Sequence, residues 1–385
     1  MPVPLFDTKV QNNALATDLQ AAFARVLASG QFILGPEVQG FERQCAEYLG
    51  VRHAIGISSG TDAILLALMA LGIGPGDEVI CPSFTFFATA GCVTRTGAKP
   101  VFCDVHPGTF NLDVADAARR VTPRTKAIMP VHLYGQAAEM AALNALARQH
   151  GLKVIEDACQ AVGATQEGKR VGSLADFGAF SFFPTKNLGA FGDAGLLTTN
   201  DDVLAQRATL LRNHGAHPKY YHQFVGGNFR LDAVQAALLA VKLPLLDGYA
   251  QRRTANATRY TEHFTKLPGV ALGNAATAAA RIVLPFAQPG NGHTWNQYTL
   301  RLPGAGRRDA LREWLAARQI GTEIYYPVPL HAQACFASLG QTDADLPVSA
   351  RLAGEVISIP IFPELTAAQQ DEVIAAVAEF LAVGK

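Results

Sequence analysis

Between residues 50 and 200, short apolar runs alternate with helical runs, and this alternation constrains the fold more than any other feature of the chain. The apolar runs lie at 54–58, 78–82, 99–105, 125–133, 152–158, 178–183 and 194–200. Helical patterns at 61–72 and 140–151 each end at a glycine that suits a helix C-cap. Apolar strands separated by helices are typical of a mostly parallel sheet covered on both faces. The sequence therefore predicts an α/β fold.

A second, smaller α/β pattern follows toward the C-terminus. A helical pattern covers 231–264, and we expect it to bend or break near Pro244. The segments expected next are a connection at 273–280, a strand at 295–302, a helix at 307–321, a strand and loop at 322–330 and a helix at 366–382. The chain has 385 residues, which suits more than one domain. We predict a large domain at 1–250, with an N-terminal segment near the small domain, and a smaller domain at 251–385.

The charge balance and the apolar pattern exclude several classes of partner. Lysine plus arginine and aspartate plus glutamate both number 32, so no overall field attracts nucleic acid or an anionic membrane. No basic segment precedes an apolar stretch at the N-terminus, and the longest apolar run, 63–72, is too short to cross a bilayer. The six cysteines (Cys45, Cys81, Cys92, Cys103, Cys159 and Cys335) include no CxxC pair, which fits a reducing compartment. We predict a cytoplasmic protein with no nucleic-acid or membrane partner.

Polar residues follow two of the predicted strands, at the edge where open α/β sheets bind ligands. SSGTDA at 58–63 is a strand-to-helix turn in which the amides of Gly60 and Thr61 can bind an anion. The same turn can also be an ordinary helix cap. Asp157 closes the apolar run at 152–158, where it either caps a helix, forms a salt bridge or binds a cationic ligand.

Lys186 lies in SFFPTKNLGAFGDAG at 181–195, between aromatic residues and glycines. A solvated surface lysine is the ordinary alternative, but a loop of this composition is a poor solvated surface. Burial lowers the pKa of a lysine and frees its amine, which can then form an imine with an aldehyde. We interpret Lys186 as a nucleophilic lysine.

An anion site, a carboxylate and a nucleophilic lysine together match the needs of pyridoxal phosphate. The phosphate suits the helix N-terminus, the pyridinium nitrogen suits Asp157, and the aldehyde suits Lys186. A carboxylate beside the ring nitrogen keeps that nitrogen protonated, so the ring can accept electrons from a carbanion. The aromatic stretch at 82–90 can supply an apolar face for the ring.

The order of these motifs resembles that of the DegT/DnrJ/EryC1/StrS sugar aminotransferases, a family of fold type I pyridoxal phosphate enzymes. Matching segments run from GQFILGPEV at 30–38, through SSGTDA, VIEDACQAVGA and the lysine loop, to IGTEIYYPVPLH at 320–331. The resemblance covers nearly the whole chain. It implies a large domain with a mostly parallel mixed sheet covered by helices, followed by a smaller α/β domain. Lys186 also argues against the family members that carry histidine there and perform deoxygenation.

The resemblance implies a role for each residue of the cofactor site. Lys186 would form the imine, and Asp157 would contact the ring nitrogen. Gln160 would lie near the hydroxyl edge of the ring, and Phe86 would stack on it. The implied phosphate ligands are Gly60, Thr61, Ser181 and, from a second copy of the chain, Asn228. The expected working unit is therefore a homodimer with shared active sites.

The resemblance also implies the reaction. An amino acid, L-glutamate in similar proteins, would leave its amine on the cofactor as pyridoxamine phosphate, and a nucleotide-linked ketosugar would then receive it, with ping-pong kinetics. The implied substrate residues are Arg230, Tyr325, Tyr326 and His331. YYPVPLH is more similar to relatives that aminate C3 of the sugar than to those that aminate C4. The two tyrosines could instead be ordinary packing residues, and Arg230 an interface salt bridge.

Two other functions stay open. One is a regulatory protein that keeps the fold without turnover, although the cofactor set is complete and no DNA-binding module is evident. The other is a different pyridoxal phosphate reaction. Desulfuration needs a reactive thiol, and Cys335 is the only cysteine in a plausible position, with no activating neighbour. His214, His217 and His222 lack a cysteine or carboxylate to complete a metal site, so we expect a solvated loop and no metal.

Overall fold

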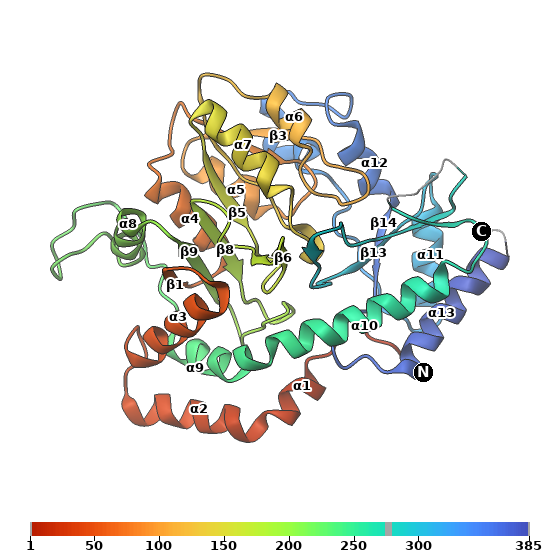
Figure 1. Cartoon of the computed structure of the whole chain (residues 1–385), viewed down its shortest axis with the longest axis horizontal. Helices are drawn as coiled ribbons and strands as arrows, with labels where there is room; N and C mark the ends of the chain where they lie inside the picture. The colour runs from red at the N-terminus through yellow and green to blue at the C-terminus, as the bar shows by residue number, and fades with distance from the viewer. Residues whose placement is uncertain (1, 274–278, 384–385) are drawn as a thin grey trace.

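The structure is a computed structural model that describes residues 2–273 and 279–383. Most of the connection expected at 273–280 lies outside the described residues. A large α/β body lies on one side of the molecule, and strands and helices of the C-terminal part lie on the other (Figure 1). The N-terminus lies beside this C-terminal part, where Val3 bridges to Ile320.

A seven-stranded sheet forms the centre of the large body. Its strands stand in the order β1-β9-β8-β5-β4-β2-β3. They are β1 (His53–Ile57), β2 (Glu78–Pro82), β3 (Lys99–Cys103), β4 (Thr125–Ile128), β5 (Lys153–Asp157), β8 (Phe177–Ser181) and β9 (Gly195–Thr199). β9 runs antiparallel to both of its neighbours, and the other pairs are parallel. The predicted mostly parallel sheet is confirmed.

Helices cover both faces of this sheet. One face carries α4 (Gly60–Ala70), α5 (Ala88–Arg95) and α8 (Asp202–Arg212). The other carries α2 (Ala16–Ser29), α3 (Pro36–Leu49), α6 (Val114–Arg119), α7 (Met140–His150) and α9 (Ala233–Lys242). Successive side chains of a strand enter opposite cores, so that Ile155 packs with α4 and Val154 with α7. Because both faces are buried, each strand is apolar throughout.

A four-stranded sheet in the order β10-β11-β13-β14 forms the C-terminal layer. Its strands are β10 (Val270–Leu272), β11 (Ile282–Leu284), β13 (Tyr298–Arg301) and β14 (Val356–Ile359), with helices α11 (Arg307–Ala316), α12 (Pro347–Glu355) and α13 (Ala367–Ala382). The prediction of a strand within 322–330 is wrong, since this segment pairs with β14 only through an isolated bridge between Glu323 and Ser358. Pro327 and Pro329 lack the N–H groups that a longer ladder needs.

The remaining elements are short. A three-stranded sheet joins β12 (Asn291–Gly292), β6 (Thr165–Gln166) and β7 (Lys169–Arg170). Helix α1 (Lys9–Ala14) and the 3-10 turns η1 (Leu133–Gly135), η2 (Leu243–Leu245), η3 (Leu330–Ala332) and η4 (Ala334–Leu339) complete the described chain.

The long helical pattern at 231–264 is broken, as predicted, near Pro244. Helix α9 ends at Lys242, η2 follows, and α10 (Leu246–Phe264) continues toward the C-terminal layer (Figure 1). By length and composition alone, Ala233–Phe264 could cross a membrane, but half of its most apolar window is buried inside the fold, as in a core helix. Since α10 spans residue 250, the domain boundary placed there stays a prediction.

Arg253 of α10 ties this helix to the C-terminal layer. Its side chain is buried, and its Nη1 donates to the carbonyl oxygens of Trp295 at 2.9 Å, Ile361 at 3.0 Å and Asn296 at 3.4 Å. Burial lowers the pKa of Arg253 to about 10, against the opposing effect of Glu364, so the side chain is charged at neutral pH. Three backbone carbonyls therefore depend on one buried cation.

Replacing Arg253 with methionine should lower the free energy of unfolding by about 2–4 kcal/mol, because the three carbonyl groups lose their charged donor. The neighbouring Arg252 is the matched control, since it is half exposed and pairs with Glu364 at 3.7 Å. Arg252→Met should cost less than about 1 kcal/mol. Urea unfolding followed by circular dichroism measures both values, and equal midpoints for the two variants would contradict this role of Arg253.

Candidate active site

Lys186 lies in a tight loop between β8 and β9. Backbone hydrogen bonds of 2.8 Å, from Ala190 N to Phe182 O and from Phe182 N to Ala194 O, close the base of this loop. The Lys186 side chain is partly buried. Burial lowers the pKa of its ammonium group, and Cys159 and Asp157 oppose this shift. A lowered pKa is the property needed by a lysine that reacts as a free amine.

Asp157 ends β5 within the central sheet, and only 4% of its surface is exposed. The Thr89 hydroxyl on α5 donates to Oδ2 at 2.8 Å, and the Cys159 amide donates to Oδ1 at 3.2 Å. These bonds fix the orientation of the carboxylate. Both of these donors are neutral, so a cationic ligand can still pair with the carboxylate.

The N-terminus of α4 lies beside both groups. Ser59 caps the helix, as its Oγ accepts a first-turn amide at 3.1 Å. Gly60 and Thr61 occupy the next two positions, where the amides have no partner within the helix. A Cβ at Gly60 would lie 2.7 Å from both Cys159 Sγ and Ser181 Cβ, so only glycine fits. The amides of the helix start and Ser181 thus form one electropositive corner.

Gln160, Tyr326 and Phe86 gather on the neighbouring side. Gln160 Nε2 donates to the Tyr326 hydroxyl at 2.9 Å, and its Oε1 accepts from the Tyr134 amide at 2.8 Å. The rings of Tyr326 and Phe86 lie 6.2 Å apart, and Phe86 is 54% exposed, which leaves ring surface open for stacking. Burial raises the pKa of the Tyr326 hydroxyl, and the charge of Asp157 raises it further, so the hydroxyl stays protonated. The effect of Asp157 shows that Tyr326 belongs to the same site.

His331 and Tyr325 are placed differently from the other predicted residues. His331 is buried, with Nδ1 2.6 Å from Ser83 Oγ and Nε2 2.9 Å from Asp343 Oδ1. Both ring nitrogens are occupied, so this geometry favours packing over the predicted substrate contact. The backbone carbonyl of Tyr325 accepts the Tyr134 hydroxyl, while its side chain packs beside the Tyr326 ring.

Arg230 and Asn228 follow a loop that extends away from the body after α8 (Figure 1). The carbonyl of Phe229 accepts from the Ser58 amide at 3.0 Å, which places this segment beside the start of α4. Arg230 Nη1 donates to Asn213 Oδ1 at 2.7 Å. Asn228 is exposed in the single chain, so its side chain can meet a second copy.

Two residues of the site escaped the sequence reasoning, Thr89 and Cys159. Cys159 follows Asp157 by two residues, which is a local signal, whereas the contact of Thr89 with Asp157 joins distant parts of the chain and has no local signal. Burial raises the pKa of the Cys159 thiol well above its usual value, with Asp157 adding to the shift. Cys159 is therefore a protonated packing residue rather than a nucleophile. Cys335, the thiol considered from the sequence, is exposed in η4.

Removing the Thr89 hydroxyl should weaken the hold on Asp157. Thr89→Val keeps the shape but leaves Oδ2 without its donor, so kcat should fall about 10-fold with little change in KM. Thr94→Val, on the same helix, removes a hydroxyl bonded to the Ala90 carbonyl and is the control. Steady-state kinetics of both variants test this, and equal activity of the two would show that the bond to Asp157 is dispensable.

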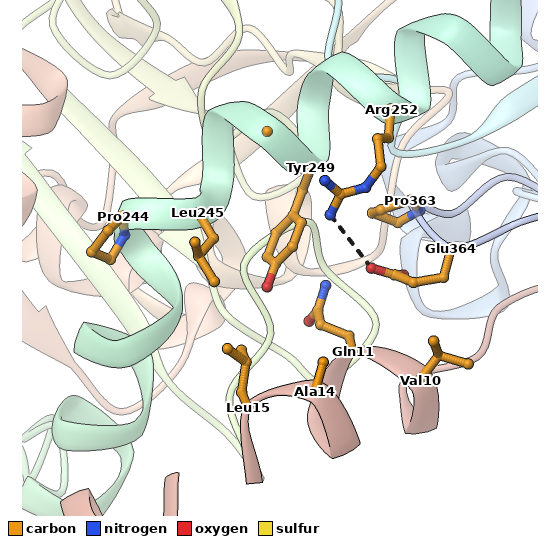
Figure 2. Close-up of a pocket in the computed structure, with 11 residues that line it drawn as sticks. Val10, Gln11, Ala14, Leu15, Pro244, Leu245, Tyr249, Arg252, Pro363 and Glu364 are labelled. Carbon is orange, nitrogen blue, oxygen red and sulfur yellow. Dashed lines mark ion pairs between the residues drawn. The ribbon is translucent and has the colours of Figure 1, made fainter. Parts of the chain in front are cut away.

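Other pockets and clusters lie apart from this site. A pocket of about 520 Å³ lies between α1, α10 and Pro363–Glu364, with Tyr249 and the Arg252–Glu364 ion pair at its wall (Figure 2). None of its lining residues belongs to the Lys186 site. In the part of the chain that the structure describes, no three histidine, cysteine, aspartate or glutamate residues are grouped closely enough to hold a metal ion.

The residues brought together fit pyridoxal phosphate. The Lys186 amine suits the aldehyde, the donor-held Asp157 carboxylate suits a protonated ring nitrogen, and the α4 amides with Ser181 suit a phosphate. Such a set, placed at the carboxyl ends of β5 and β8 in a mostly parallel sheet, is that expected of a pyridoxal phosphate enzyme.

Comparison with known proteins gives the family. The chain belongs to the DegT/DnrJ/EryC1/StrS aminotransferase family, whose profile matches residues 13–378. It is 48% identical over 380 residues, 99% of each chain, to the pleiotropic regulatory protein of Geobacillus stearothermophilus. It is 44% identical to the dTDP-3-amino-3,4,6-trideoxy-alpha-D-glucose transaminase of Streptomyces venezuelae, over 98% of this chain and 96% of that one.

Solved structures agree with this assignment. The crystal structure of S. venezuelae DesV in complex with ketimine intermediate matches with a TM-score of 0.93 and 44% identity, over 98% of each chain. The structure of Bacillus subtilis ntda with bound cofactor PMP matches with a TM-score of 0.87 and 32% identity, over 96% of this chain and 82% of that one. The predicted fold class and family are confirmed.

Proposed function

We propose that the protein transfers an amino group from L-glutamate to a nucleotide-linked ketosugar with pyridoxal phosphate as cofactor. The observation that carries this proposal is the convergence of Lys186, whose pKa is lowered by burial, with the buried Asp157 carboxylate. The family and the similarity to a dTDP-amino-sugar transaminase support the substrate class.

When bound, pyridoxal phosphate supplies an aldehyde that exchanges amines and a ring that withdraws electrons from the reacting carbon. In this proposal the amides of Gly60 and Thr61 and the Ser181 hydroxyl bind its phosphate, and the exposed face of Phe86 covers the ring. Asp157 would accept a hydrogen bond from the protonated ring nitrogen, because its buried carboxylate is oriented by two donors. Gln160, fixed by Tyr134 and Tyr326, binds the hydroxyl edge.

Lys186 moves the proton. Once the amino donor has displaced Lys186 from the cofactor, its Nζ would be a free amine that takes the proton from the donor carbon and gives it to the cofactor carbon bonded to the transferred nitrogen. The lowered pKa of Lys186 makes the unprotonated form available closer to neutral pH. The protonated Tyr326 hydroxyl can donate a hydrogen bond to the substrate from the same wall.

The proposal extends to the sugar nucleotide, to its aminated carbon and to the residues that contact it. We propose amination at C3, on the resemblance of the 325–331 segment and on the 3-amino sugar named for the Streptomyces relative. Arg230 and Tyr325 are proposed to contact the nucleotide sugar. His331 is a weaker candidate for this contact, because both of its ring nitrogens already have protein partners. We propose a cytoplasmic location, where nucleotide sugars and glutamate are both found.

The working unit is proposed to be a homodimer in which Asn228 reaches the phosphate of the neighbouring site. The loop before Asn228 exposes large apolar side chains, including Val225 at 92% and Tyr220 at 78%, as an interface segment does in a free chain. In a mixture of Lys186→Ala and Asn228→Ala chains, a mixed dimer then carries one intact site. Equal mixing after subunit exchange should restore about a quarter of wild-type activity.

This mixing result distinguishes the two placements of Asn228. If Asn228 acts only within its own chain, both sites of the mixed dimer are damaged and mixing restores nothing. Analytical ultracentrifugation gives the oligomeric state independently, and a monomer at working concentration would contradict the dimer.

A regulatory role without turnover is the second candidate, because one similar protein bears the name pleiotropic regulatory protein. One absorption experiment distinguishes the two functions. The purified protein loaded with pyridoxal phosphate should lose its visible absorption when L-glutamate is added and release one 2-oxoglutarate per site, and a nucleotide 3-ketosugar should restore the absorption. No change with glutamate or any other amino donor would favour the regulatory function.

A further inference from the structure

Helix α9 contacts the loop that carries Lys186 through two side chains. Gln235 Oε1 accepts from the Phe191 amide at 2.8 Å. Lys242 Nζ donates to the Gly189 carbonyl at 2.9 Å and lies 4.7 Å from the centre of the Phe191 ring. The backbone on the C-terminal side of Lys186 is thus anchored to α9 at Gly189 and at Phe191.

Lys242 is an unusual residue for this position. Its side chain is only 2% exposed, and its hydrogen bond goes to a backbone carbonyl rather than to a carboxylate. Burial lowers its pKa to about 8, with Glu364 opposing the shift, so it is still mostly an ammonium at neutral pH. A buried lysine without a carboxylate partner is costly, and leucine or methionine would pack there at a lower cost. The contacts with Gly189 and Phe191 are what this charge provides.

Close backbone contacts within the loop couple the position of Gly189 to that of Lys186. Gly189 turns so closely over Pro184 that a Cβ at Gly189 would lie 2.3 Å from the Pro184 carbonyl oxygen. The amide of Lys186 donates to Phe183 at 2.8 Å within the same turn. Residues 183–190 therefore form a compact unit, and a shift of the Gly189 carbonyl moves the backbone of Lys186 with it.

We propose that Lys242 is a positioning residue, whose ammonium group fixes the Gly189 carbonyl and the Phe191 ring and so sets the place of the Lys186 amine. The inference rests on the proposed function, since the position of Lys186 matters for an amine that reacts with a bound aldehyde. Displacement of a reacting group by about 1 Å can lower a rate by about 100-fold. Lys242 acts through the loop and touches no reacting atom.

The first test needs no cofactor. Hydrogen–deuterium exchange of the full-length chain is measured for wild type, Lys242→Met, Lys242→Arg and Lys126→Met. Lys126 is an exposed lysine of β4 and serves as the matched control. Exchange should rise in the peptides that cover 183–191 for Lys242→Met but not for Lys126→Met, and Lys242→Arg, which keeps a cationic donor, should remain near wild type. Gln235→Met removes the second anchor and should give the same local rise.

The second test uses the chain loaded with pyridoxal phosphate. The pH midpoint of its visible absorption should shift in Lys242→Met but not in Lys126→Met, because this midpoint depends on the position of the Lys186 nitrogen relative to the cofactor. The single-turnover rate at saturating L-glutamate should fall about 10- to 100-fold with less than about a 3-fold change in glutamate affinity.

The outcomes separate the two proposals. Unchanged exchange in 183–191, a rise spread evenly over the chain, or an unshifted absorption midpoint in both Lys242→Met and Gln235→Met would overturn the positioning role. If wild type itself fails to react with any amino donor, the proposed function fails, while the exchange and absorption results still decide the role of Lys242.

Discussion

Lys186→Ala is expected to abolish amino transfer, with kcat lower by at least about 10⁴-fold. The substitution removes both the nucleophile and the base of the site. The phosphate corner at α4 and the Asp157 carboxylate remain, so the variant should still bind pyridoxamine phosphate. Coupled detection of 2-oxoglutarate measures turnover, and calorimetry measures binding of pyridoxamine phosphate.

Two controls make this result specific. Lys126→Ala removes an exposed lysine from β4 and should leave activity unchanged. Circular dichroism and the urea midpoint of Lys186→Ala should match wild type, because Lys186 lies in a loop outside the helices and strands. Turnover within 10-fold of wild type in Lys186→Ala would refute the assignment.

Asp157→Ala should lower kcat by about 10²–10³-fold. Without the carboxylate, no described group of the site offers a negative charge to the ring nitrogen, so the ring loses most of its capacity to withdraw electrons. The KM for L-glutamate should change much less, because Asp157 acts on the reacting carbon through the cofactor. Stopped-flow absorption of the half-reaction with glutamate measures this step.

A modified cofactor distinguishes this role from damage to the fold. Pyridoxal phosphate methylated on the ring nitrogen carries a permanent positive charge, and the space left by Asp157→Ala can hold the methyl group. It should recover a large part of the lost rate in Asp157→Ala but not in Lys186→Ala. Asp371→Asn, at an exposed position on α13, is the charge control. Equal rates for Asp157→Ala and Asp371→Asn would remove Asp157 from the mechanism.

Most of the central sheet could be predicted, because its strands are buried on both faces and therefore read as short apolar runs. The break near Pro244 followed from the chemistry of proline. Strand β14 was missed, since VISI at 356–359 directly continues helix α12 with no glycine or proline between them. Helix 307–321 was predicted too long, because α11 ends at Ala316 although the apolar pattern continues.

The site could be predicted in part, where function and local sequence coincide. Asp157 and Lys186 stand out because a carboxylate at a strand end and a lysine among aromatics both oppose the local pattern. The bond from Thr89 to Asp157 joins residues 68 apart in the chain, and no local pattern encodes it. The burial of His331 likewise depends on Ser83, which lies 248 residues earlier.

The site that escaped prediction entirely is the anchor behind the lysine loop. Gln235 and Lys242 lie on one side of α9, where the sequence pattern alone reads as an amphipathic helix. Only the packing of α9 against the loop shows that Lys242 faces a backbone carbonyl. Sequence patterns report the periodicity of burial, whereas the partner of a buried polar group is a property of the tertiary fold.

The most direct measurement locates the cofactor on the chain. The protein loaded with pyridoxal phosphate is reduced with borohydride, digested with trypsin and mapped by mass spectrometry. Modified Lys186 resists cleavage, so the phosphopyridoxyl group should appear on the single peptide 171–207, bounded by Arg170 and Arg207. The group on another peptide, or on none, would contradict the assignment of Lys186 and with it the proposed reaction.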